Sequence, residues 1–229
     1  MLTLKRYVQR FPGSSIPAEI ETTDGQRLVM KMKGAGNGVQ SLVAEFIVNR
    51  AAVAMGWNVP DAFAVEIPQG FPWEFGTDEF DDIVQRSYGM NLGLQYLGPC
   101  QALEAEAIKA LSPKLLGEMA TLDALFLNYD RLASSKNVLL DEKGKHWIID
   151  HGSCQFLDED FVRKPLALAP GHLLLPGQDL IQRKSLMALW DEAMEASIEV
   201  PEAWRQELGW DVTRLTEALE ARAEALGLL

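Results

Sequence analysis

The first hundred residues alternate between apolar and polar side chains in short runs, a pattern typical of β-strands. The runs that predict strands lie at residues 3–8, 17–22, 26–32, 58–67, 82–85 and 92–97. Thr23, Asp24 and Gly25 separate two of these runs and predict a hairpin turn. Residues 40–55 have helical spacing and end at Gly56, so they predict one helix within this strand-rich part.

After Gly98 and Pro99 the pattern becomes helical. Here the pattern predicts a buried helix at residues 115–128, a hairpin at 137–140 and 146–149, and amphipathic helices at 179–196 and 201–228. The residues from 154 to 176 have no clear period, and residues 69–79 predict a loop. This order of elements indicates an α+β fold, with a β-rich part at 1–97 and a helical part at 98–229.

Composition narrows the class of protein. With 229 residues and 48% hydrophobic content, the chain can bury a substantial core, which excludes disorder. The net charge of −12 argues against direct binding to nucleic acid, which depends on clustered Lys and Arg. Cys100 and Cys154 lack CxxC spacing, and the sequence shows neither a membrane span nor a secretory signal. We therefore expect a cytoplasmic protein.

Acid and amide side chains lie around the predicted hairpin. Asp130 follows the buried helix, where it could also belong to a turn, while Asn137 precedes the first hairpin strand and Asp150 follows the second. Because the two hairpin positions lie at the same end, we expect the three side chains to converge. A carboxylate that orients a hydroxyl, and an amide and a carboxylate that hold Mg²⁺, are what phosphoryl transfer from ATP requires. We expect His151 to be structural and Gly152 to allow a sharp exit from the strand.

A lysine and a glutamate upstream form a second candidate pair. Lys31 lies within an otherwise apolar strand, where it could also extend its ammonium to water from an edge position. Glu45 lies beside the apolar stripe of the predicted helix, where a carboxylate is costly unless it is paired. Lys31 is the nearest preceding cation on a strand, with Lys33 as the alternative. A strand lysine held by a helix glutamate is how kinases fix nucleotide phosphates.

The glycine-rich stretch at residues 34–38 raises a different possibility. A strand, a glycine loop and a helix are the context of a dinucleotide-binding fingerprint. However, Val39 stands where that fingerprint requires its third glycine, and no acid ends a second parallel strand about twenty residues on. A nicotinamide-dependent enzyme is therefore the weaker alternative, and a turn or a contact with phosphate is favoured.

Together these motifs resemble those of the HipA-like serine/threonine kinases, particularly the short stand-alone members, over about residues 10 to 175. The resemblance implies a bilobal protein-kinase-like fold, ATP with Mg²⁺ as cofactors, and the bacterial cytoplasm. It implies that Lys31 binds phosphates, that Glu45 braces Lys31 and that Asp130 orients the acceptor hydroxyl. By the same resemblance, Asn137 and Asp150 would hold Mg²⁺.

The phosphate loop of that family corresponds to residues 11–17 here. Gly13, Ser14 and Ser15 are accordingly assigned to nucleotide binding, and either serine is a candidate for autophosphorylation. Gln95, in the predicted strand at 92–97, is assigned to the same site. The expected acceptor is a protein Ser/Thr hydroxyl, and an antitoxin-like partner is a possibility because toxin kinases of the family pair with antitoxins.

Two departures from the family pattern leave an alternative open. Ser135 stands where many kinases have Asn, five residues after the catalytic Asp, and the phosphate loop has few glycines. Both features would suit a pseudokinase that binds a nucleotide or a partner without turnover. Residues 155–178 are the candidate equivalent of an activation loop.

Overall fold

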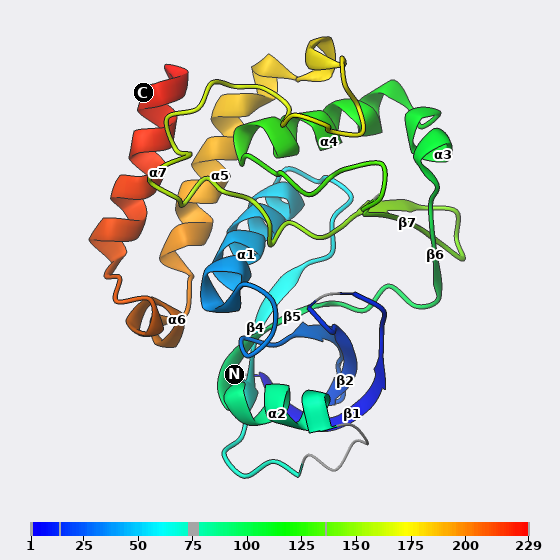
Figure 1. The fold of residues 1–229 in the computed structure, drawn as a ribbon, viewed down its shortest axis with the longest axis vertical. Helices are drawn as coiled ribbons and strands as arrows, with labels where there is room; N and C mark the ends of the chain where they lie inside the picture. Colours follow the sequence, from blue (N-terminus) through cyan, green and yellow to red (C-terminus); the bar gives the residue numbers. More distant parts are fainter. Residues whose placement is uncertain (1, 14, 73–77, 136, 229) are drawn as a thin grey trace.

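The computed structural model describes residues 2–13, 15–72, 78–135 and 137–228. Five strands close into a barrel in the order β1-β2-β3-β5-β4 (Figure 1). The strands are β1 (Leu2–Arg10), β2 (Ala18–Thr22), β3 (Arg27–Lys31), β4 (Ala62–Ile67) and β5 (Gly89–Gln95). The neighbouring pairs are antiparallel except β1 and β4, which pair in parallel and close the barrel. These strands and the predicted hairpin turn, where Gly25 donates to the Thr22 carbonyl, are confirmed.

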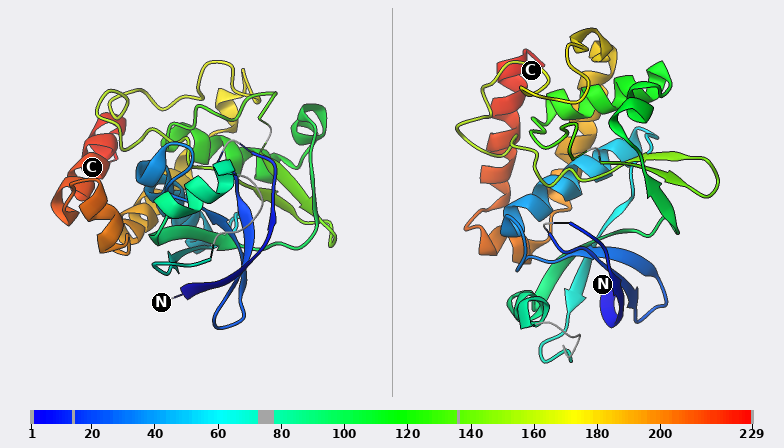
Figure 2. Two further views of the ribbon diagram at one scale, coloured as in Figure 1. Left: turned by 60° about the horizontal axis from the view of Figure 1, so that its bottom comes forward. Right: turned by 45° about the vertical axis from the view of Figure 1, so that its right-hand side comes forward.

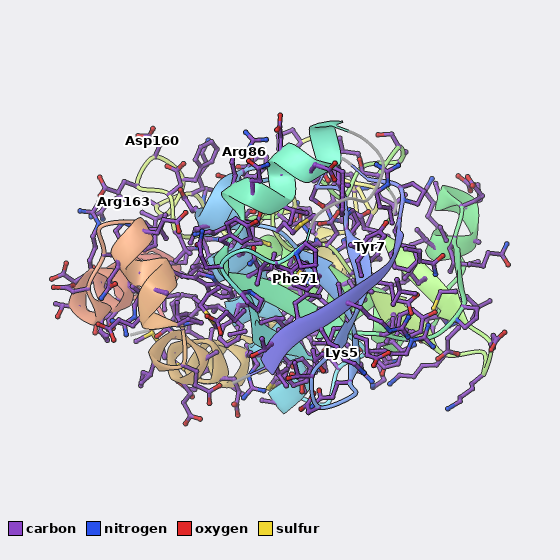
Figure 3. All side chains as sticks on the ribbon, turned by 90° about the horizontal axis from the view of Figure 1, so that it is seen from below. Lys5, Tyr7, Phe71, Arg86, Asp160 and Arg163 are labelled. Carbon is purple, nitrogen blue, oxygen red and sulfur yellow. The ribbon has the colours of Figure 1, made fainter. Side chains whose placement is uncertain are left out.

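The predicted strand at residues 82–85 is wrong, because these residues belong to helix α2 (Asp78–Arg86). Phe80, Ile83 and Val84 are buried and have the i, i+3, i+4 spacing of one helix face. That face covers the end of the barrel near Tyr7 and Phe71 (Figure 3). A run of four residues is too short to distinguish the helical period of 3.6 residues from the strand period of two residues. The predicted loop at 69–79 lies partly outside the described residues, and α2 begins within it.

Helix α1 (Gly38–Ala54) lies between the barrel and the helical part of the molecule (Figure 2). It packs chiefly against α5 (Leu186–Ile198) and also touches α6 (Glu202–Glu207), where Phe46 meets Trp204 edge to face at 5.8 Å. It ends at Gly56, whose φ of 72° is the left-handed conformation that the sequence predicts. The apolar side chains of α1 therefore join the core of the helical part rather than the interior of the barrel. The division of the chain at residues 97 and 98 stays a prediction.

The remaining elements follow β5. They are β6 (Cys100–Ala102), α3 (Ala105–Lys109), α4 (Pro113–Leu125), β7 (Val138–Asp141), β8 (His146–Ile148), two 3₁₀ turns at Gln178–Leu180 and Arg183–Ser185, and α7 (Val212–Leu226). The predicted buried helix and the predicted hairpin are confirmed as α4 and as β7 with β8. The two C-terminal helices are shorter than predicted, because 3₁₀ turns precede α5 and Gly209, at φ 66°, separates α6 from α7. No helix in the described ranges is both long and apolar enough to cross a membrane.

Candidate active site

Lys31 is the centre of an ion cluster that joins three distant elements. It ends β3, and its Nζ lies 2.7 Å from Oε2 and 2.9 Å from Oε1 of Glu45 in α1. The same Nζ lies 2.7 Å from Oδ1 of Asp150, which follows β8. Lys33, the alternative partner, binds Glu207 at 2.6 Å instead. The structure thus brings Lys31, Glu45 and Asp150 together, and of these contacts the sequence predicts the one between Lys31 and Glu45.

Two carboxylates in this cluster share one ammonium. Burial works to lower the pKa of Lys31, but the attraction of both carboxylates outweighs it and raises that pKa. Burial also raises the pKa of Glu45, which is 1% exposed. At Asp150 burial acts in the same direction, yet Lys31 overcomes it and holds the pKa below its ordinary value. Asp150, whose side chain is 39% exposed, is therefore the accessible carboxylate of the cluster, and Lys31 favours its charged form.

Asn137 and Asp150 lie side by side at one end of the β7–β8 hairpin. The Ile149 N–H donates to the Asn137 carbonyl at 3.1 Å. The Arg131 guanidinium donates to the Asn137 carbonyl at 2.9 Å and to the Ile149 carbonyl at 3.4 Å. Asn137 and Asp150 have φ values of 50° and 65°, a region that costs a non-glycine residue energy. The left-handed residue at the strand exit is thus Asp150 rather than Gly152. Such strain is often found where a side chain is aimed at a ligand.

Asp130 is connected to the end of the hairpin by the next residue in the chain, Arg131. Its N–H donates to Asn128 Oδ1 at 3.0 Å, and its carbonyl accepts from the Leu132 N–H at 3.0 Å. The next residue, Arg131, is the one whose guanidinium holds the Asn137 carbonyl. Asp130 therefore belongs to a turn that is bonded to the end of the hairpin, and its side chain is half-buried.

The residues assigned to nucleotide binding separate into two groups. Ser15 lies against the glycine-rich loop, since a Cβ added to Gly36 would be 3.7 Å from the Ser15 Cβ. Gly13, at φ 150°, is in the same loop as Ser15, whereas Ser14 lies outside the described residues. Gln95 pairs with Leu28, three residues along β3 from Lys31 or about 10 Å away. Its side chain is exposed, and its Oε1 is 3.5 Å from the Asp61 N–H, so the structure does not bring it to the lysine.

The glycine-rich loop has a different context from a dinucleotide fingerprint. That fingerprint joins parallel strands through its helix, whereas β3 pairs antiparallel with both of its neighbours. Gly34 is needed for a close approach, because a Cβ there would lie 2.6 Å from the Ile83 carbonyl of α2. The loop therefore connects the strand of Lys31 to the helix of Glu45 while resting on α2.

The donors at the hairpin end fit a magnesium ion. Asp150 offers a charged and accessible carboxylate, and the buried Nδ2 of Asn137 has no hydrogen-bond partner within the described ranges. Because the two ends of an amide are assigned from their hydrogen bonds, either end of Asn137 could face a ligand. Among the described residues no three His, Cys, Asp or Glu side chains gather into a metal site. Mg²⁺ suits such a sparse site, since it is usually held by one or two carboxylates together with phosphates and water.

Sequence reasoning missed two buried polar residues behind this site, Asp123 and His172. Asp123 lies in α4 and accepts hydrogen bonds from Arg131 at 2.5 Å and from His172 at 3.0 Å. The signal was present, since an acid in the middle of an apolar helix must find a partner. The identity of that partner could not be read locally, because His172 is 49 residues away.

His151 is fully buried beside α1, with Nδ1 2.7 Å from Asn49 Oδ1. Because the amide oxygen can only accept, Nδ1 carries the proton. Nε2 has no hydrogen-bond partner among the residues described. Burial lowers the pKa of His151 to about 3, so the ring is neutral in the folded protein at neutral pH.

We expect His151 to make the folded state less stable in acid. The unfolded chain binds a proton at the ordinary histidine pKa of about 6.5, whereas the folded chain binds it only near pH 3. Between these values the free energy of unfolding should fall by up to about 1.4 kcal/mol per pH unit on account of this residue. Urea unfolding at pH 7, 6 and 5 measures it, with His151→Gln as the non-titrating comparison. Equal pH slopes for the two proteins would contradict the assignment.

Comparison with known proteins gives a family and a fold. The model of a family described as HipA-like kinase matches residues 8–225. Among solved structures the chain is similar to the proinflammatory kinase CtkA of Helicobacter pylori, with a TM-score of 0.51 and 10% identity over 97% of this chain and 95% of that one. At this identity the similarity shows the fold alone, an α+β fold of the kinase type.

Two other solved kinases are more distant. They are the choline kinase LicA of Streptococcus pneumoniae (TM-score 0.34, 12% identity, 96% of this chain and 94% of that one) and the MAP kinase LmaMPK10 of Leishmania major (0.29, 10%, 96% and 77%). TM-scores this low support no argument about this chain. No curated protein matches it.

Proposed function

This chain belongs to the HipA-like kinase family, and we propose that it transfers a phosphoryl group from ATP, with Mg²⁺, to a serine or threonine hydroxyl of a protein. Membership in this family and a kinase-like fold make it a phosphotransferase. The observation that carries the finer proposal is the Lys31 ammonium, which lies 2.7 Å from both the Glu45 and the Asp150 carboxylates. In this proposal the barrel and the helical part are the two lobes, with their division near residues 97 and 98.

Each residue has a distinct task in the proposed reaction. Lys31, oriented by Glu45, binds the nucleotide phosphates, and Asn137 and Asp150 bind the metal ion. Asp130 orients the acceptor hydroxyl and accepts its proton. When bound, ATP would supply the phosphoryl group and leave as ADP, and Mg²⁺ would offset the negative charge of the phosphates. Catalysis then rests on positioning and charge stabilisation, which is usual for phosphoryl transfer.

The substrate and the cellular setting are part of the proposal. A protein hydroxyl as the acceptor, and an antitoxin-like protein as a partner, come from the family resemblance. The two cysteines, both within the described residues, are not bonded to each other. This supports a reducing compartment such as the cytoplasm.

The Asp130→Ala protein is the direct test. We expect transfer from radiolabelled ATP with Mg²⁺ to fall by about 100-fold, because the acceptor hydroxyl loses both its orientation and its proton acceptor. Asp160→Ala is the control, since Asp160 is exposed in the 155–178 segment (Figure 3). Equal rates for Asp130→Ala and the parent would exclude Asp130 from the reaction.

The second candidate function is that of a pseudokinase, which Ser135 and the glycine-poor 11–17 loop favour. Such a protein would be stabilised by ATP in a thermal-shift measurement and would show no turnover. Stabilisation that requires Mg²⁺, together with turnover, supports the enzyme instead.

A further inference from the structure

Arg131 is buried and fully engaged, although it follows Asp130 directly in the chain. Its side chain is 0% exposed. The guanidinium has five N–H groups and makes five contacts: two with Asp123, two with the Ile149 carbonyl and one with the Asn137 carbonyl. No donor is left for another anion. Arg131 thereby joins α4 to the hairpin end that carries the proposed metal ligands.

Asp123 is the carboxylate that fixes this arginine, and it also binds the 155–178 segment. It accepts from Asn128 Nδ2 at 2.9 Å and faces His172 Nε2 at 3.0 Å. His172 Nδ1 accepts the Leu174 N–H at 3.0 Å, so the ring proton is on Nε2 and is donated to Asp123. Asp123 therefore holds the Asp130 loop (residues 128–135) and His172 at the same time.

Both halves of the 155–178 segment are hydrogen-bonded near the end of α4 and the start of the Asp130 loop. The Leu173 N–H donates to the Arg131 carbonyl at 2.8 Å. Arg222 of α7 binds the carbonyls of Val162 and Lys164 in the segment and those of Ala124 and Leu125 at the end of α4. Each half of the segment is thus fastened beside the helix that leads into the Asp130 loop.

The sequence of this segment has a further property. Residues 155–178 contain no Ser, Thr or Tyr, and so offer no hydroxyl for phosphorylation. Many kinases order their activation loop by adding a phosphate that pairs with arginine. The 155–178 segment of this chain has no hydroxyl that could be phosphorylated, and the N–H groups of Arg131 are all bonded to other described residues.

We propose that Asp123 and His172 are positioning residues for the kinase reaction, which hold the 155–178 segment against the Asp130 loop without phosphorylation. Asp123 is the anion that pairs with Arg131. His172 binds the segment to Asp123. Arg131 binds the carbonyls of Asn137 and Ile149 and so holds the end of the hairpin that carries Asn137 and Asp150. This proposal rests on the proposed function for its catalytic meaning but not for its structural part.

Hydrogen exchange tests the structural part without requiring activity. In His172→Phe, which keeps the ring volume and loses the bond to Asp123, we expect peptides covering residues 146–150 to exchange about tenfold faster. These residues have no bond to position 172 among those that the structure shows, so the effect would reach them through the Asp130 loop, to which His172 and Leu173 are bonded. His172→Gln, whose amide can still donate to Asp123, should restore the protection. Leu175→Ala, which removes a side chain of the same segment that is 41% exposed, should leave the exchange of residues 146–150 unchanged.

Kinetics tests the catalytic part. We expect His172→Phe to lower kcat by about 10- to 100-fold with an unchanged Kd for an ATP analogue, because misplaced groups slow transfer without weakening nucleotide binding.

The outcomes separate the two proposals. Exchange changes confined to residues 155–178 in His172→Phe, or an unchanged kcat of His172→Phe beside an active parent, would overturn the positioning proposal. If the parent transfers no phosphate, the proposed function fails, and the exchange measurement still decides whether Asp123 and His172 couple the segment to the hairpin.

Discussion

Replacing Asp150 with asparagine is expected to lower the rate of phosphoryl transfer by about 1000-fold. The variant keeps the shape of the side chain and removes the one accessible carboxylate that faces Lys31 at 2.7 Å. The charge that would hold Mg²⁺ is then lost. The fold should persist, because Lys31 keeps its buried partner Glu45 at 2.7 Å. Transfer from labelled ATP over a range of Mg²⁺ concentrations measures the effect.

Asp141→Asn is the matched control for this variant. Asp141 lies at the opposite end of the same hairpin, where it accepts from the Lys143 and Lys145 N–H groups and from Trp147 Nε1. We expect its transfer rate to stay close to that of the parent. If Asp150→Asn transfers phosphate as fast as Asp141→Asn, the assignment of Asp150 to the metal is wrong.

Arg222→Met is expected to lower the free energy of unfolding by about 2–5 kcal/mol. Arg222 is fully buried and donates to four backbone carbonyls, two at the end of α4 and two in the 155–178 segment. Burial lowers its pKa to about 10, so it stays charged at neutral pH. Methionine fills the space but leaves four acceptors without a donor. Recovery of the cost of burying the guanidinium offsets part of this loss. Since domains have only about 5–15 kcal/mol of stability, the loss is a large fraction.

The control for Arg222→Met is Arg214→Met in the same helix. Arg214 is exposed and reaches the exposed Glu159 at 3.0 Å. Its replacement should change the free energy of unfolding by less than about 0.5 kcal/mol. Urea unfolding of the three proteins gives the comparison, and equal midpoints for the two variants would show that the buried carbonyls find other donors.

Local pattern predicted most of the barrel and the hairpin, and it failed where the local signal was short. The strands of the barrel and the β7–β8 pair follow from alternation between turn residues. The prediction of a strand at residues 82–85 was wrong because these four residues, which form one turn of the longer helix α2, give the same pattern as a short strand. The break between α6 and α7 at Gly209 was missed because a single glycine is tolerated within a helical pattern.

The candidate site was predictable to a similar degree. A buried carboxylate needs a partner, and this requirement at Glu45 predicted its pairing with Lys31. The two strands of a hairpin are joined at one end and pair along their length, so the start of the first strand and the end of the second lie together, which predicted that Asn137 and Asp150 are neighbours. The assignment of Gln95 had no such physical constraint, and the structure places it at the far end of its strand from the lysine. That Lys31 contacts Asp150 directly is a relation across 119 residues.

The sequence by itself determined the strands of the barrel and the hairpin and the side chains that are candidates for the chemistry, because residue type and spacing act over a few neighbours. Only the tertiary structure decided that α1 shares the core of the C-terminal helices and that Asp123 binds both Arg131 and His172. These depend on which buried polar groups and apolar faces meet once the chain has closed. A buried polar group must have a hydrogen-bond partner, but which residue becomes that partner depends on how the whole molecule packs.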